Sequence, residues 1–122
     1  MIYKTVEELR EACKFWQEIL SLEDWQVVIR FARVYEIGED SQGRCNWVLE
    51  RKEAVILILD HQDWDPDCAF EQDHERTIIH ELCHLHFAPF FGEETPDHKI
   101  EKEQAIHAVS RALIRIKVVR RL

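Results

Sequence analysis

The sequence predicts a single α+β domain, with a small, mostly antiparallel three-stranded sheet and helices packed on one side of it. Its length of 122 residues is the usual size of one domain. The apolar periodicities indicate, in order, a helix, three strands and two helices, a grouping typical of α+β proteins. No Pro- or Gly-rich linker divides the chain, since it contains only 3 Gly and 3 Pro. We therefore expect residues 1–122 to form one domain.

The N-terminal half is predicted to contain one helix and all three strands. Thr5 and Glu8 fit a capping box, and Leu9, Cys13 and Trp16 then recur on one face of a helix. Three segments rich in strand-forming residues follow: Trp25–Val34, Cys45–Glu50 and Ala54–Leu59. The last of these is a continuous apolar run, which predicts a strand covered on both faces.

The C-terminal half is predicted to contain two helices. The first runs from about residue 71 to residue 87 and ends before Pro89, because proline cannot continue a helix. The second begins at Thr95 and Pro96, since proline suits the first helical position. It continues almost to the C-terminus, with a buried face expected at Ile106, Val109, Leu113 and Ile116.

Charge and composition exclude several classes of function. Sixteen basic and 24 acidic side chains give a net charge of −8, which disfavours sequence-independent nucleic-acid binding. No run approaches the roughly 18 apolar residues of a membrane span, and the start lacks the apolar segment of a secretory signal. The four cysteines form no C-x-x-C pair, so we expect reduced thiols and a cytoplasmic protein. The cations near the C-terminus fit the end of a helix: Arg111, Arg115, Lys117, Arg120 and Arg121.

Two histidines separated by three residues form the most informative motif. The segment reads His80-Glu81-Leu82-Cys83-His84, and residues at i and i+4 share one face of a helix, so both imidazoles can reach a single cation. Glu81 is rotated by about 100° from His80, which places it beside a metal-bound water as a general base. The buried side of this helix is predicted at Ile78, Leu82 and Leu85. This pattern favours a zinc site.

A catalytic zinc site needs a third protein ligand and keeps one position for water. The downstream candidates are His86, Glu93, Glu94, Asp97, His98, Glu101, Glu103 and His107. Glu103 precedes Ile106 by three positions, so it lies on the apolar side of the last predicted helix, where an unpaired carboxylate would be costly. His98 lies near the start of that helix and competes for the same role. The sequence favours Glu103 and leaves His98 as the alternative.

The motif His80-Glu81-Leu82-Cys83-His84, followed by a helix with Glu103-Gln104-Ala105-Ile106, resembles the minimal gluzincin-type metallopeptidases. These include the ImmA/IrrE family and related small phage-encoded zincins. The resemblance covers residues 54–115 and implies a zincin-like domain in which His80, His84 and Glu103 bind zinc and Glu81 activates the zinc-bound water. It also implies hydrolysis of a peptide bond in a protein substrate, with a repressor or other regulatory protein as the target.

The sequence departs from the ImmA/IrrE pattern after Glu103, because Ile106 and Val109 stand near the positions where those proteins have Asn and Phe.

Two other zincin families share part of the pattern. SprT-like zincins have a third histidine beyond a turn glycine, and Gly92 and His98 are similar in layout. Peptide deformylases use an upstream Cys ligand, but the residues around Cys45 do not match their signature, so we expect Cys45 to be a core thiol.

The same residues permit a function of another class, a small zinc-stabilised interaction module that cleaves nothing. Its metal would be structural, with the fourth position filled by Cys83, His98 or a partner group, and Glu81 would be idle. For the enzyme, the strand Ala54–Leu59 is expected to be the edge with which an extended substrate pairs. His107 is either an exposed helix residue or a group that orients a ligand or donates to an oxyanion.

Overall fold

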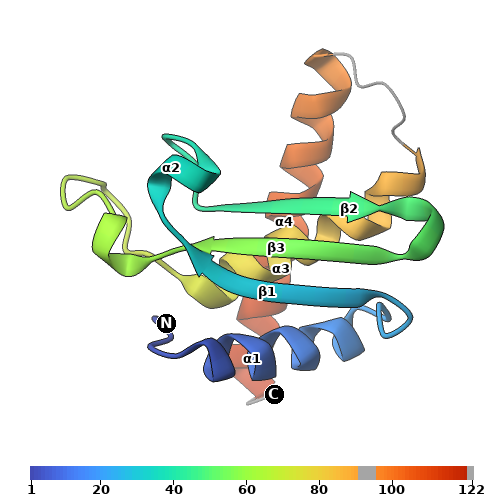
Figure 1. The fold of residues 1–122 in the computed structure, drawn as a ribbon, viewed down its shortest axis with the longest axis horizontal. Helices are drawn as coiled ribbons and strands as arrows, with labels where there is room; N and C mark the ends of the chain where they lie inside the picture. Colours follow the sequence, from blue (N-terminus) through green and yellow to red (C-terminus); the bar gives the residue numbers. More distant parts are fainter. Residues whose placement is uncertain (91–95, 121–122) are drawn as a thin grey trace.

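The computed structural model describes residues 1–90 and 96–120 (Figure 1). The α+β class predicted from the sequence is confirmed. The helices and strands follow in the order α1 Val6–Ile19, β1 Gln26–Ala32, α2 Val34–Ile37, β2 Gly43–Val48, β3 Glu53–Leu59, α3 His74–Phe87 and α4 Pro96–Arg120. Short 3-10 turns occupy Leu49–Arg51, His61–Asp63 and Ala88–Phe90.

The sheet is mixed, with the strand order β1-β3-β2. β2 and β3 form the expected antiparallel hairpin, but β1 pairs with β3 in parallel, from Gln26 opposite Glu53 to Ala32 opposite Leu59. The prediction of a mostly antiparallel sheet is therefore met by only one of the two strand pairs. The reason is that two chain reversals separate β1 from β3, one through α2 and one through the hairpin, so the two strands run in the same direction.

The N-terminal helix forms as predicted. The Thr5 hydroxyl accepts a hydrogen bond from the Glu8 backbone N–H, and the Glu8 carboxylate accepts one from the Thr5 N–H, which completes the capping box. Leu9, Cys13 and Trp16 are buried. This face packs α1 against β1 and α3, with α3 and α4 behind the sheet in Figure 1.

The motif helix α3 begins at His74, later than the predicted start, because Asp73 caps it by accepting a hydrogen bond from the Arg76 N–H. The first turn is fixed by a fully buried imidazole. His74 Nδ1 accepts from the Tyr3 N–H at 2.9 Å, so Nε2 carries the proton and donates to the Leu59 carbonyl at 3.2 Å. The start of α3 is thereby held between the N-terminal segment and the end of β3.

The buried side of α3 is the one that the sequence predicted. Ile78, Leu82 and Leu85 are at most 1% exposed and belong to the main hydrophobic core. In that core, this side of α3 packs with residues of α1, β1 and β3, and α3 also contacts β2 and α4.

The buried face of α4 agrees with the predicted one only in part, since Leu113 packs against the core as predicted. Ile106 is fully buried, but Val109 and Ile116 are 42% and 48% exposed. Lys102 and Ser110 are buried in their place, and the Ser110 hydroxyl donates to the Ile106 carbonyl at 2.7 Å. The stripe therefore follows i, i+4, i+8, which is narrower than expected because α4 packs mainly on one neighbour, α3.

The far end of α4 is attached to α1 and α3 through a buried carboxylate. Glu75 Oε2 accepts hydrogen bonds from the Tyr3 hydroxyl at 3.3 Å and from the Trp16 indole N–H at 3.2 Å, and it forms an ion pair with Lys117. The Lys117 ammonium also lies over the Phe15 and Trp16 rings, 5.3 and 5.6 Å from their centroids. One of the C-terminal cations thus has a structural role.

Some predictions fall on residues that the structure does not describe. Gly92, Glu93, Glu94, Thr95 and Arg121 lie outside the described residues, as do the side chains of Asp97 and Arg120. Among the described residues, no helix is both long and apolar enough to cross a membrane.

Candidate metal centre

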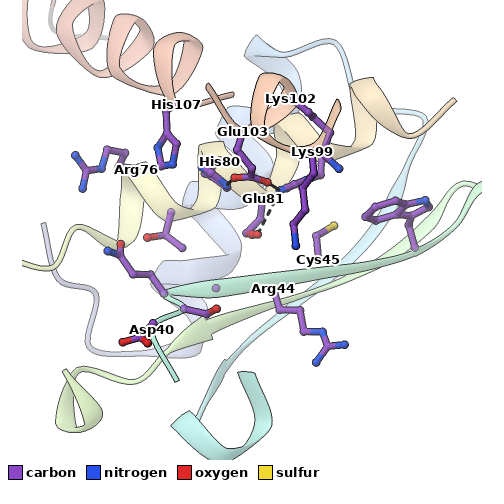
Figure 2. Close-up of a pocket in the computed structure, with 16 residues that line it drawn as sticks. Asp40, Arg44, Cys45, Arg76, His80, Glu81, Lys99, Lys102, Glu103 and His107 are labelled. Carbon is purple, nitrogen blue, oxygen red and sulfur yellow. Dashed lines mark ion pairs between the residues drawn. The ribbon is translucent and has the colours of Figure 1, made fainter. Parts of the chain in front are cut away.

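Two consecutive helices bring three potential ligands together. His80 and His84 lie on successive turns of α3. Glu103 comes from α4, and Figure 2 shows it beside His80. Glu103 Oε2 lies 3.1 Å from His80 Nε2, and Oε1 lies 3.3 Å from His84 Nε2. The carboxylate therefore spans both imidazoles, with one oxygen near each.

The residue types at this contact can be compared with those that bind zinc. With zinc–ligand bonds of about 2.0–2.2 Å, neighbouring ligand atoms in a tetrahedral site lie about 3.3 Å apart. The two Glu103–imidazole distances are close to this value, although each runs to a different oxygen of the carboxylate. Two imidazole nitrogens and one carboxylate are also a donor set found in catalytic zinc sites. The residues present therefore fit the metal that the motif predicted.

The charge state of His80 suits a metal ligand. Burial lowers the pKa of His80 to about 4, an effect that the neighbouring Glu103 carboxylate opposes and that His84 and His107 reinforce. The imidazole is therefore neutral at pH 7. Only a neutral imidazole has a free nitrogen lone pair to offer a cation.

Glu81 is a buried carboxylate beside these ligands. Its side chain is 6% exposed, and Oε1 lies 4.0 Å from His84 Nε2. Oε2 is buried and has no hydrogen-bond partner in the part of the chain that the structure describes. Burial, with a smaller contribution from Glu103, raises the pKa of Glu81 to about 8. An unsatisfied carboxylate in this position is costly unless a ligand or a proton occupies it.

Gly43 allows β2 to approach Glu81 closely. A Cβ atom at this position would lie 2.7 Å from Thr77 Cγ2, 3.1 Å from the Leu57 carbonyl oxygen and 3.3 Å from Glu81 Cγ. Only a glycine therefore permits the observed contact between the start of β2 and α3. This role of Gly43 was not identified from the sequence, because the contact is between segments far apart in the chain.

His107 extends the cluster by one turn of α4. Its ring centroid lies 4.7 Å from that of His80, and the ligand atoms of His80, Glu103 and His107 all lie within 4.8 Å of one another. His80, Glu81 and His84 form a second group of the same kind. His107 is exposed, so its ring contacts both the His80 ring and solvent.

The alternative ligands lie elsewhere. Within the described residues, His98 is exposed and belongs to neither potential metal-binding group. Cys83 is 3% exposed, packs in the hydrophobic core and belongs to neither group. Cys45 packs against the core as expected, but it also lines the cavity in front of Glu81. Burial raises the pKa of the Cys45 thiol, so it remains protonated at neutral pH.

The cluster opens into a cavity of about 640 Å³ between β2, α3 and α4. Trp47 of β2 lines it, with its ring stacked on that of His84 at a centroid distance of 6.3 Å. The strand beside the cavity is β2 and not the predicted Ala54–Leu59, because β3 is the central strand and both of its edges are paired.

One edge of β2 is not paired with any strand of the described residues. The Leu59 N–H donates to the Gln42 carbonyl at 2.9 Å, and paired positions alternate in an antiparallel ladder. The backbone N–H and C=O groups of Gly43, Cys45 and Trp47 therefore point away from β3. The same three residues line the cavity.

The structure therefore brings together four of the residues singled out from the sequence: His80, Glu81, His84 and Glu103. The pattern of histidines at i and i+4 located α3, and the position of Glu103 three residues before Ile106 indicated the contact from α4, although the Glu103 side chain is 34% exposed. Comparison of the chain with protein-family models, with curated proteins and with solved structures finds no match in any of the three.

Proposed function

We propose that this chain is a zinc-dependent metallopeptidase that hydrolyses a peptide bond in a protein substrate. The observation that carries the proposal is the meeting of His80 and His84 with the Glu103 carboxylate, beside the unsatisfied Glu81. The resemblance of the motif to gluzincin-type enzymes points to the same activity. The four cysteines are free thiols, which supports a cytoplasmic location.

Three side chains would hold the metal: His80 and His84 through their Nε2 atoms, and Glu103 through its carboxylate. When bound, zinc would supply a Lewis acid that polarises a carbonyl and lowers the pKa of a water molecule towards 7. His107 contacts the His80 ring and would help to orient that ligand.

Glu81 would act as the general base. Its carboxylate lies next to His84 without pairing at Oε2, so one oxygen is free to accept a proton from the attacking water. The same carboxyl group would then donate this proton to the leaving amine. A burial-raised pKa keeps Glu81 close to the working pH of such an exchange.

An extended substrate would pair with the free edge of β2. The outward-facing backbone groups of Gly43, Cys45 and Trp47 offer the hydrogen bonds that β-strand addition requires. The scissile carbonyl would then lie between this edge and the His80–Glu81–His84 face of α3. The resemblance suggests a repressor or other regulatory protein as the target.

Metal content tests the ligand assignment. We expect about one zinc per chain in the purified wild type by elemental analysis, and large losses in His84→Ala and Glu103→Ala. His98→Ala is the matched control and should keep its zinc, because His98 belongs to neither group of potential ligands. Zinc retained by Glu103→Ala but lost from His98→Ala would transfer the third ligand to His98.

Activity tests the role of Glu81. Glu81→Gln should keep zinc and lose cleavage of a protein or peptide library by about 10²- to 10⁴-fold, measured by mass spectrometry of the products. Glu101→Gln, an exposed acidic residue on α4 outside both groups, should cleave normally. Bound zinc with four protein ligands and no cleavage by the wild type would instead support the non-catalytic interaction module.

A further inference from the structure

The cavity in front of the metal centre is rich in cations, although the chain as a whole carries a net charge of −8. Its charged lining residues outside the histidines are Asp40, Arg44, Arg76, Glu81, Lys99, Lys102 and Glu103. Glu81 and Glu103 belong to the proposed metal centre. The remaining lining therefore contains four cations and one carboxylate, which is the reverse of the overall charge balance, and Lys102 is the one of these cations that is buried.

Lys99 is the cation best placed to contact a bound peptide. It precedes Glu103 by four residues, so it lies one turn earlier on the same face of α4. Figure 2 shows its side chain extending from α4 across the cavity towards β2, near Cys45. Among the described residues Lys99 makes no ion pair, whereas Lys52 and Lys117 are paired with Asp24 and Glu75.

Arg76 occupies the matching position on α3. It precedes His80 by four residues, and its side chain forms no ion pair with another described residue. Figure 2 shows Arg76 and Lys99 on opposite sides of the His80–Glu103 contact, with Arg76 on the side of His107. A peptide lying along the cavity would therefore meet a cation on either side of the metal centre.

We propose that the cavity selects peptides carrying a carboxylate close to the scissile bond, and that Lys99 binds this carboxylate. This inference rests on the proposed function for the position of the scissile bond. Four residues of helix rise by about 6 Å, and an extended peptide advances about 3.3 Å per residue. The carboxylate recognised by Lys99 therefore lies within about two residues of the bond that is cut.

Two sources can supply such a carboxylate: an Asp or Glu side chain, and the C-terminus of the peptide itself. Three pools of short peptides with an uncharged fluorophore separate them. The first has Glu at the central position and an amidated C-terminus, the second has Gln and an amidated C-terminus, and the third has Gln and a free C-terminal carboxylate. All other positions are randomised over uncharged residues.

Binding is measured by fluorescence anisotropy on zinc-loaded Glu81→Gln, which is not expected to cleave the peptides, and again on protein stripped of metal. We expect the Glu pool, or the free-carboxylate pool, to bind about fivefold more tightly than the amidated Gln pool at low salt. The preference should decrease in about 0.5 M NaCl, because salt screens an exposed ion pair.

Charge reversal decides whether Lys99 is responsible, since a carboxylate can also bind zinc directly. Lys99→Glu should abolish or invert the preference in both the zinc-loaded and the stripped protein. Lys14→Glu, the same change at an exposed position on α1 outside the cavity, should leave it intact. Equal binding of all pools by the wild type, or an unchanged preference in Lys99→Glu, would overturn the proposal.

The two proposals fail in different ways. If the wild type cleaves the pools without preferring a carboxylate, the peptidase function stands and the role of Lys99 falls. If Lys99-dependent binding is seen but zinc-loaded wild type cleaves no pool, the carboxylate site stands and the peptidase function falls.

Discussion

Helix α3 carries two buried carboxylates, and the protein treats them differently. Glu75 and Glu81 are 6% and 5% exposed. Glu75 receives donors from three other parts of the chain: the Tyr3 hydroxyl, the Trp16 indole and the Lys117 ammonium. Glu81 has one oxygen 4.0 Å from His84 and the other without any partner among the described residues.

The two carboxylates differ in whether hydrogen bonds and an opposite charge compensate for their burial. A buried charge is tolerated when hydrogen bonds and an opposite charge compensate for lost hydration, as at Glu75. At Glu81 the compensation is missing, so the protein raises its pKa to about 8 instead. Carboxylates left in this state cluster at functional sites, because a ligand or a proton in transit completes them.

Breaking the compensated site should have the largest effect on stability. Glu75→Gln removes the negative charge opposite Lys117 and leaves a partly buried ammonium without its counter-charge. We expect the free energy of unfolding to fall by about 3 kcal/mol, measured by denaturant unfolding. The double variant Glu75→Gln with Lys117→Met should recover part of this loss, and equal losses in the single and double variants would contradict the assignment.

Replacing Glu81, which lacks such partners, should stabilise the metal-free protein at high pH. Between pH 4.5 and 8 the unfolded chain releases a proton that native Glu81 keeps, so the native state of the metal-free protein loses stability as pH rises through this window. Glu81→Gln removes this loss but buries an amide without partners.

At pH 8 we therefore expect metal-free Glu81→Gln to be more stable than the wild type by about 2 kcal/mol, and the two to converge near pH 4.5. Thermal unfolding in the presence of a chelator measures this difference. A wild type that is as stable as the variant at both pH values would show that Glu81 is ionised or hydrogen-bonded after all.

A smaller effect is expected where the backbone passes close to Glu81. Gly43→Ala introduces a methyl group 2.7 Å from Thr77 Cγ2 and 3.1 Å from the Leu57 carbonyl oxygen. Relieving this overlap should cost about 1–2 kcal/mol of unfolding free energy. It should also reduce peptidase activity, because β2 and Glu81 must move apart. Full stability and activity in Gly43→Ala would mean that the strand yields easily.

The smallest effect is expected at an exposed pair remote from both carboxylates. Asp24 and Lys52 form an ion pair in which each side chain is more than half exposed. Solvent screens such a pair, so Asp24→Asn should unfold at the same denaturant concentration as the wild type within experimental error. A clear loss of stability here would weaken the contrast drawn from Glu75.

Local patterns predicted much of the fold and of the candidate site. The capping box at Thr5, the buried side of α3 and the identity of Glu103 as the third member of the cluster all follow from periodicity and the cost of burying polar groups. Each depends on residues a few positions apart, where the chain itself fixes the geometry. The assignment of zinc and of peptidase activity stays a prediction.

What could not be predicted depends on contacts between distant segments. The parallel pairing of β1 with β3, the approach of Gly43 to Thr77 and the ion pair of Lys117 leave no periodic trace in the sequence. Val109 and Ile116 were wrongly assigned to the buried face of α4 for the same reason. Ile116 is apolar, but whether it is buried depends on which neighbour lies beside that turn.

The length of α4 has a consequence for local unfolding of the protein. This single helix of 25 residues extends for about 37 Å, with Glu103 in its first half and Lys117 near its end. We therefore expect the two ends of α4 to unfold as one cooperative unit, so that zinc bound at Glu103 also stabilises the helix around Lys117. In amide hydrogen exchange, adding zinc would slow the backbone around Lys117 as well as that around Glu103.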